Sequence, residues 1–304
     1  MLTPYIHNLI ENLPTKERNL DIVLEGGAFN GSFEYGILYF LQELKKKHPT
    51  IIGRVSGVSI GAVLGLLFLI EKLEIYKKYY DKIRNHLKKN ANMDIVYKIT
   101  DEIFEKISDD EFEKIKYNKL FIHYYDTEQK KLILRKKYET KDDLKKVILR
   151  TCYIPFLIDG NYLLENKFID GCFPYIFPER EKQILYVKIS QICKLTYMLN
   201  TKNEKNISGR ALEGIIDIYN FFLHNKPTNM CSWVNNWMLF DFIKLRCKRW
   251  FILSLVYYIY TIIQIFKQIK PFLCVSFFEQ SEYFQRIKPI LCSLYKDFIL
   301  YLCF

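Results

Sequence analysis

The sequence lacks the patterns that bind metal ions or build a disulfide framework. Its eight cysteines form no Cys-x-x-Cys pair, and none stands with a histidine at the spacing of a zinc site. Histidine itself is scarce, with five copies in 304 residues. We therefore expect no metal centre and no cofactor, and we expect reduced, mostly buried thiols of the kind found in reducing compartments.

The N-terminus lacks the apolar run of a secretory signal, and the chain has no internal repeat or low-complexity tract. Residues 1–20 carry two prolines and several charges, so we expect a polar leader and a cytoplasmic or membrane-associated protein. Hydrophobic residues make up 50% of the chain, which is ample for a folded core.

Acidic residues are fewer than basic ones, 34 against 45, so the net charge is +11. This excess favours an acidic partner, either nucleic acid or an anionic membrane surface, although a solvated lysine-rich surface explains it equally well. The basic residues are dispersed and accompany no nucleic-acid module. We therefore expect no nucleic-acid binding.

A Gly-x-Ser-x-Gly pentapeptide at residues 57–61 is the central catalytic signal. It lies between an apolar stretch at 51–55 and an apolar run at 60–70. A sharp strand-to-helix turn of this kind exposes a serine hydroxyl and tolerates only small neighbours such as Gly57 and Gly61. We expect Ser59 to be a nucleophile at the start of a buried helix, although the pentapeptide alone also occurs by chance in loops.

A glycine loop precedes this turn. Residues 21–24 predict a strand, residues 25–32 a glycine-rich loop and residues 33–44 a helix. Backbone N–H groups in such a loop can converge on a phosphate or an oxyanion. Nucleotide binding is disfavoured, because Gly26 and Gly31 fit a phosphate-binding loop but Ser32 stands where that loop requires lysine.

Two successive strand-loop-helix units predict an α/β fold with adjacent parallel strands and both loops at one edge of the sheet. The glycine loop and Ser59 would then face each other. Farther along we expect a charged helical insertion or lid at 71–119, strands at 120–125, 131–135 and 184–189, helices at 141–150 and 212–222, and a hairpin-like pair running from Asp159-Gly160 to 168–171.

Asp170 ends one of these expected strands just before Gly171. A carboxylate at this position can project into a site, although an ordinary Asp-Gly turn such as Asp159-Gly160 has the same residues. The residues on their own do not separate the two interpretations.

The composition changes in the C-terminal part. Residues 250–266 form an apolar, aromatic run with basic residues on both sides. Its length is at the lower limit for crossing a bilayer of about 30 Å. Basic flanks and aromatic side chains also suit a helix that lies on a membrane surface, and a buried helix explains the apolar run equally well.

Taken together, the glycine loop, the serine pentapeptide and the Asp-Gly pair resemble the patatin-like phospholipases over about residues 21–189. Three further positions also match the pattern of this family. They are Gly36 in the helix after the loop, Thr151-Cys152-Tyr153-Ile154-Pro155 upstream of the aspartate, and Pro178 eight residues after Asp170. Four positions depart from the family pattern, and they are Ala28 for the third glycine, Asn30 for a basic residue, Cys172 for glycine or alanine, and Ile176 for asparagine.

The resemblance implies a three-layer α/β/α fold with a mostly parallel sheet and a Ser-Asp dyad that hydrolyses lipid esters. Ser59 would be the nucleophile, Asp170 the base, and the backbone N–H groups of Gly26, Gly27 and Ala28 the oxyanion hole. Gly31, Gly57, Gly61 and Gly171 complete the motifs. The implied partner is a lipid or phospholipid, with contact to a membrane surface.

Two alternatives remain open. A Ser-Asp-His triad would use His224, and the other four histidines are expected to be structural. A patatin fold that binds membranes without turnover would explain the altered loop at Ala28 and Asn30. In either case we divide the chain into a leader (1–20), a catalytic domain (21–190) and a helical, possibly membrane-associated C-terminal region (191–304).

Overall fold

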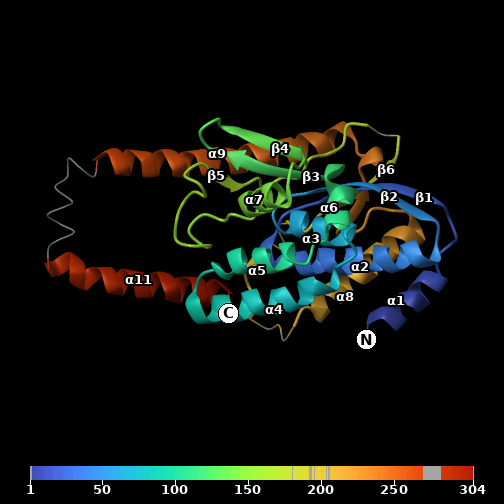
Figure 1. Cartoon of the computed structure of the whole chain (residues 1–304), viewed down its shortest axis with the longest axis horizontal. Helices are drawn as coiled ribbons and strands as arrows, with labels where there is room; N and C mark the ends of the chain where they lie inside the picture. Colours follow the sequence, from blue (N-terminus) through green and yellow to red (C-terminus); the bar gives the residue numbers. More distant parts are fainter. Residues whose placement is uncertain are drawn as a thin grey trace.

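The centre of the computed structural model is a seven-stranded sheet, counted over the described residues 2–179, 181–191, 194, 196–202, 204, 206–269 and 282–303. Its strand order is β4-β3-β2-β1-β6-β7, and β5 pairs with β3 (Figure 1). The strands are β1 (Arg18–Leu24), β2 (Thr50–Gly57), β3 (Tyr117–Asp126), β4 (Lys131–Lys137), β5 (Phe168–Asp170), β6 (Gln183–Val187) and β7 (Cys231–Trp233).

The middle of the sheet is parallel and its edges are antiparallel. Strand β1 pairs with β2 and β6 in parallel, and β2 pairs with β3 in parallel. Strands β4, β5 and β7 are all added antiparallel. The β1–β2 and β2–β3 pairings bring the C-terminal ends of β1 and β2 to one edge, as the two strand-loop-helix units predict.

Alternating side chains of β1 divide the core into two parts. Leu20, Ile22 and Leu24 face a large core that is completed by helices, whereas Val23 faces a smaller one on the other side. Helices that contribute to the large core are α1 (Leu2–Glu11), α2 (Gly31–Lys47), α3 (Ile60–Leu69), α4 (Glu74–Asn90), α5 (Ile95–Phe104), α6 (Asp109–Ile115), α7 (Lys141–Thr151) and α8 (Ser208–His224). The second face is covered by aromatic residues of segment 173–178, by Trp237 and by the start of α9 (Leu239–Ile269). The expected α/β fold with a central sheet flanked by helices is confirmed.

Two local expectations need correction. The polar leader holds α1, whose Ile6 and Ile10 are fully buried in the core. The hairpin-like pair around Asp159-Gly160 does not form, because β5 pairs with β3 instead. Among the described residues, only an isolated bridge between Leu164 and Phe168 occurs there. Beyond residue 191 the described part of the chain is mostly helical, and α8 packs on the large core while β7 joins the sheet.

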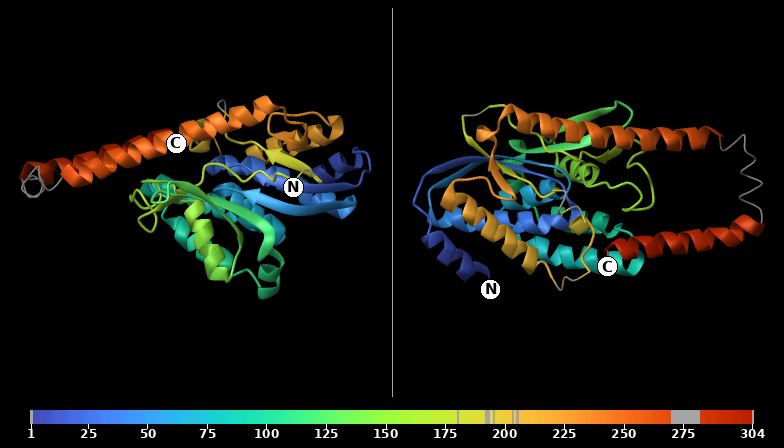
Figure 2. Two further views of the ribbon diagram at one scale, coloured as in Figure 1. Left: turned by 90° about the horizontal axis from the view of Figure 1, so that it is seen from above. Right: turned by 180° about the vertical axis from the view of Figure 1, so that it is seen from behind.

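Two long C-terminal helices extend beyond that body, as Figure 2 shows. They are α9 and α11 (Glu282–Cys303). The end of α11 returns to the fold, where the carbonyl of Cys303 accepts a hydrogen bond of 2.7 Å from the backbone N–H of Thr201. Within the described ranges, no helix is both long enough and apolar enough to cross a bilayer.

The described cysteines are free thiols. Cys193 and Cys274 lie outside the described residues. Across the part of the chain that is described, no three His, Cys, Asp or Glu side chains come together as metal ligands.

Candidate active site

Ser59 lies at the turn between β2 and α3, in a backbone conformation that side-chain-bearing residues rarely adopt. Its φ is 54° and its ψ is −130°. Glycines make this turn compact, because a Cβ on Gly57 would lie 2.5 Å from the carbonyl oxygen of Gly61, and one on Gly61 would lie 2.6 Å from that of Glu25. The strained serine conformation and the two close approaches are those of the sharp strand-to-helix turn that the pentapeptide predicts.

Thr151 fixes the backbone of this turn. Its Oγ1 accepts a hydrogen bond of 2.9 Å from the backbone N–H of Ser59 and donates one of 2.6 Å to the carbonyl oxygen of His123. Thr151 has no exposed surface, so both hydrogen bonds, by which α7 joins the Ser59 turn to β3, are shielded from water. A buried N–H without such an acceptor would be costly.

Asp170 stands at the end of β5 and lines the same cavity as Ser59. Burial raises the pKa of its carboxyl to about 6, while the nearby Ser59 hydroxyl and the backbone N–H of Cys172 act in the opposite direction. The Cys172 N–H donates a hydrogen bond of 2.7 Å to the carboxylate. Cys172 itself has φ of 59°, the left-handed region that favours glycine, at a position where the family has glycine or alanine.

The glycine loop lies directly against Ser59. A Cβ added to Gly26 would be 3.0 Å from the Ser59 Cβ, so a larger residue there would press on the serine. Ala28 occupies the third loop position with φ of 46°, a left-handed conformation that costs about 1–2 kcal/mol for an L-residue. Ala28 replaces the third glycine of the family pattern, but its backbone, including the N–H group, has a conformation that glycine favours.

Glu25 anchors the loop to the end of β6. Its buried carboxylate accepts a hydrogen bond of 2.6 Å from the Tyr186 hydroxyl and bonds of 3.1 and 2.9 Å from the backbone N–H groups of Ile189 and Ser190. Lys248 of α9 adds an ammonium 3.8 Å from the same carboxylate. Strand β6, the segment that follows it and helix α9 thus hold the residue that precedes Gly26.

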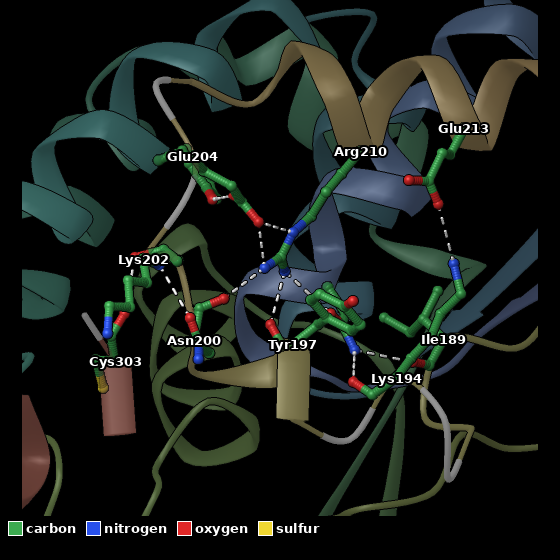
Figure 3. A network of polar contacts seen from close by, with 12 residues as sticks. Ile189, Lys194, Tyr197, Asn200, Lys202, Glu204, Arg210, Glu213 and Cys303 are labelled. Carbon is green, nitrogen blue, oxygen red and sulfur yellow. Dashed lines mark hydrogen bonds and ion pairs between the residues drawn. The ribbon is translucent and has the colours of Figure 1, made fainter. Parts of the chain in front are cut away.

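Asn30, at the position of the missing basic residue, is fully buried. It contacts the network of polar residues around Arg210 that Figure 3 shows. Its amide donates to the carbonyl oxygens of Ile189 and Lys194 at 3.0 and 2.9 Å. Its Oδ1 accepts a bond of 3.0 Å from Arg210 of α8, a guanidinium that is 5% exposed and also binds Glu204. A cationic side chain therefore contacts this corner of the loop, but it comes from another helix.

Two cavities meet at Ser59. One has a volume of about 90 Å³ and an almost entirely apolar wall from α3, α4, α5 and α7. The other has a volume of about 470 Å³ and contains Gly26, Gly27, Ala28, Ser59 and Asp170, together with Lys248 and Ile252 of α9. His224 belongs to neither cavity and is exposed at the end of α8.

The residues that sequence reasoning missed are Thr151, Arg210 and Lys248. Thr151 stood inside a matched stretch without a role, and the Gly-x-Ser-x-Gly pattern gives no hint of a threonine 92 residues away. Arg210 and Lys248 lie beyond the motifs, and only the folded chain brings them to the loop.

The sequence profile of the patatin-like phospholipases matches residues 22–178, a little more than half of the chain. The chain belongs to the patatin-like phospholipase family. VipD from Legionella pneumophila is a solved structure similar to this chain, with 14% identity and a TM-score of 0.38 over 58% of this chain and 50% of VipD. The chain thus matches half of the length of that protein. A search of curated proteins found no match.

The matched residues 22–178 contain the glycine loop, Ser59 and Asp170. They end before β6, α8 and α9, so Glu25 and Asn30 are held in place partly by residues outside the family region.

Proposed function

We propose that this patatin-like protein hydrolyses acyl esters of lipids with a Ser59-Asp170 dyad. The observation that carries the proposal is a single cavity wall that contains Ser59, Asp170 and the glycine loop. The apolar cavity that opens at Ser59 has the wall chemistry that a fatty acyl chain requires.

In this mechanism Asp170 takes the proton of the Ser59 hydroxyl while the serine oxygen attacks the ester carbonyl. An aspartate is a weak base in water, but a pKa near 6 makes its carboxylate a better proton acceptor at neutral pH. The oxyanion would be held by backbone N–H groups of Gly26, Gly27 and Ala28. In support, no backbone acceptor within the described residues is paired with the N–H of Gly26 or Gly27.

The alcohol leaves with the proton from Asp170, and the acyl group stays on Ser59. Asp170 then takes a proton from a water molecule, which attacks the acyl-enzyme. Asp170 returns this proton to the Ser59 oxygen as the fatty acid leaves, which restores the serine hydroxyl. Asp170 is therefore required twice and must be ionised at the start of each half-reaction. No step requires a metal ion.

Hydrolysis of a phospholipid by the wild type and three variants tests this assignment. We expect Ser59→Ala and Asp170→Asn to lose at least about 10³-fold in kcat, and His224→Ala to keep the wild-type rate. An inactive His224→Ala with a fully active Asp170→Asn would show that the dyad is wrong. A wild type without turnover would favour the alternative in which the fold binds membranes without catalysis.

Contact with an anionic membrane surface forms the second part of the proposal. Its support is α9, where Trp250 and Phe251 are 75% and 72% exposed and Arg246 is also exposed. Exposed aromatic residues beside basic ones are typical of helices that lie in the interface.

Flotation with vesicles tests this contact. We expect Trp250→Ser with Phe251→Ser to reduce binding to vesicles that contain phosphatidylglycerol, because the change removes two large apolar side chains from the surface. Tyr117→Ser is the control, since Tyr117 is also aromatic and exposed (56%) but belongs to β3. Equal flotation of all three proteins would exclude α9 as the contact.

A further inference from the structure

Helix α9 brings a lysine into the cavity of the proposed dyad. The Lys248 side chain is 34% exposed and lines the cavity that contains Ser59 and Asp170. Its Nζ donates hydrogen bonds of 2.7 and 3.1 Å to the hydroxyl and the carbonyl oxygen of Ser190. The lysine lies 70 residues beyond the end of the family match at residue 178.

The ammonium of Lys248 is positioned to accept an anionic ligand. Ser190 takes two of its three N–H donors, and the Glu25 carboxylate is 3.8 Å away, which is beyond hydrogen-bond distance. Among the described residues that line this cavity, Lys248 is the one cation and Asp170 the one carboxylate. Without Lys248, the Glu25 carboxylate behind it would repel a negatively charged group.

The two cavities differ in the part of an ester that they suit. The apolar cavity, lined by residues such as Val63, Leu67 and Ile103, has no charged side chain in its wall and suits the acyl chain. An ester whose carbonyl carbon lies at Ser59 and whose acyl chain fills that space directs its alcohol part into the other cavity. The alcohol part is therefore the part that meets Lys248.

We propose that Lys248 binds the phosphate of the leaving group and makes the protein prefer phospholipids to neutral acylglycerols. The inference rests on the proposed hydrolase function and names its substrate class. Ser59 and Asp170 would perform the chemistry, and Lys248 would determine the specificity. Helix α9 would then carry both the phosphate contact and the exposed Trp250 and Phe251.

The test compares two substrates with the same acyl chains in the same detergent micelles, dioleoylphosphatidylglycerol and dioleoylglycerol. Mixed micelles keep the surface constant, so the ratio of the two kcat/KM values reports recognition at the site. The variants are Lys248→Met, Lys248→Arg and the matched control Lys141→Met. Lys141 is 31% exposed and, like Lys248, contacts a carboxylate and a backbone carbonyl, but it lines neither cavity.

We expect Lys248→Met to lower the preference for the phospholipid about tenfold, the effect of one charge-assisted hydrogen bond. Lys248→Arg should keep most of the preference, and Lys141→Met should leave it unchanged. If Lys248 does nothing but hold Glu25 in place, Lys248→Met will slow hydrolysis of both substrates equally. The ratio of the two kcat/KM values will then stay at the wild-type value, and this result would overturn the proposal.

Failure of the underlying function gives a different result. If the wild type hydrolyses neither substrate, or if Ser59→Ala is as active as the wild type, the dyad itself is wrong and the assignment of Lys248 falls with it. If Ser59→Ala is inactive but Lys248→Met keeps the wild-type ratio, the dyad stands and only the phosphate contact is refuted.

Discussion

Replacing Thr151 with valine tests how Ser59 is held. Valine has nearly the shape of threonine but no hydroxyl, so the change removes the bond of 2.9 Å from the Ser59 N–H and the bond of 2.6 Å to the His123 carbonyl. Both partners are inside the protein, and Thr151 has no contact with water that could replace them.

The expected cost follows from the two broken bonds. A buried N–H left without an acceptor costs about 1–3 kcal/mol, and loss of the donor to His123 adds about 0.5–1.5 kcal/mol. We therefore expect Thr151→Val to lower the free energy of unfolding by about 1.5–4.5 kcal/mol. Thr151→Ser keeps the hydroxyl and loses one methyl group, so it should cost only about 1 kcal/mol.

Urea denaturation measures the stability of both variants, and steady-state kinetics measures the effect on the site. With Ser59 free to leave its strained conformation, kcat of Thr151→Val should fall about tenfold while KM stays near the wild-type value. Thr151→Ser should keep both constants. If Thr151→Val is as stable and as active as Thr151→Ser, the hydroxyl does not hold the turn and the reasoning is refuted.

Three further predictions concern the loop, the base and the core. Ala28→Gly should stabilise the fold by about 0.5–1 kcal/mol in urea denaturation, because relief of the left-handed φ of 46° outweighs the added backbone entropy of glycine; a less stable variant would contradict the strain. The pKa of Asp170, raised to about 6, predicts that kcat/KM falls as pH drops through 6, because the protonated carboxyl cannot act as a base; a flat profile between pH 5 and about 7.5 would exclude it. Burial raises the pKa of Glu34 in the folded protein well above its ordinary 4.5. As the pH rises above 4.5, the unfolded chain loses this proton while the folded protein keeps it. The free energy of unfolding therefore falls with rising pH. Glu34→Gln should therefore melt at a higher temperature than the wild type at pH 8 and not at pH 4, and equal melting temperatures at both values would refute this.

The fold could be predicted from the sequence because local pattern and global arrangement agree in its first half. The apolar strand at 21–24, the glycine loop and the helix after it occur as expected, and so does the unit that ends at Ser59. Strand β5 is harder to predict, because three residues carry no periodicity and its partner β3 lies more than 40 residues away. The charges of residues 1–20 predict a polar leader, and they conceal the core positions of Ile6 and Ile10 on one face of α1.

The candidate site could be predicted only as far as motifs reach. Ser59, Asp170 and the glycine loop carry local signals, and the fold brings them to one cavity. Thr151, Arg210 and Lys248 act through single long-range contacts, which leave no pattern in one sequence. The structure also gives a physical reason why the family has small residues at positions 28 and 172, since Ala28 and Cys172 both have positive φ.

Labelling with a fluorophosphonate tests the central claim most directly, because this probe reacts only with an activated serine. After labelling of the wild type and digestion, mass spectrometry identifies the modified residue. We expect the label on Ser59, no label on Ser59→Ala, and strongly reduced labelling of Asp170→Asn. A wild-type protein that takes no label, or that takes it on another serine, would contradict the proposed function.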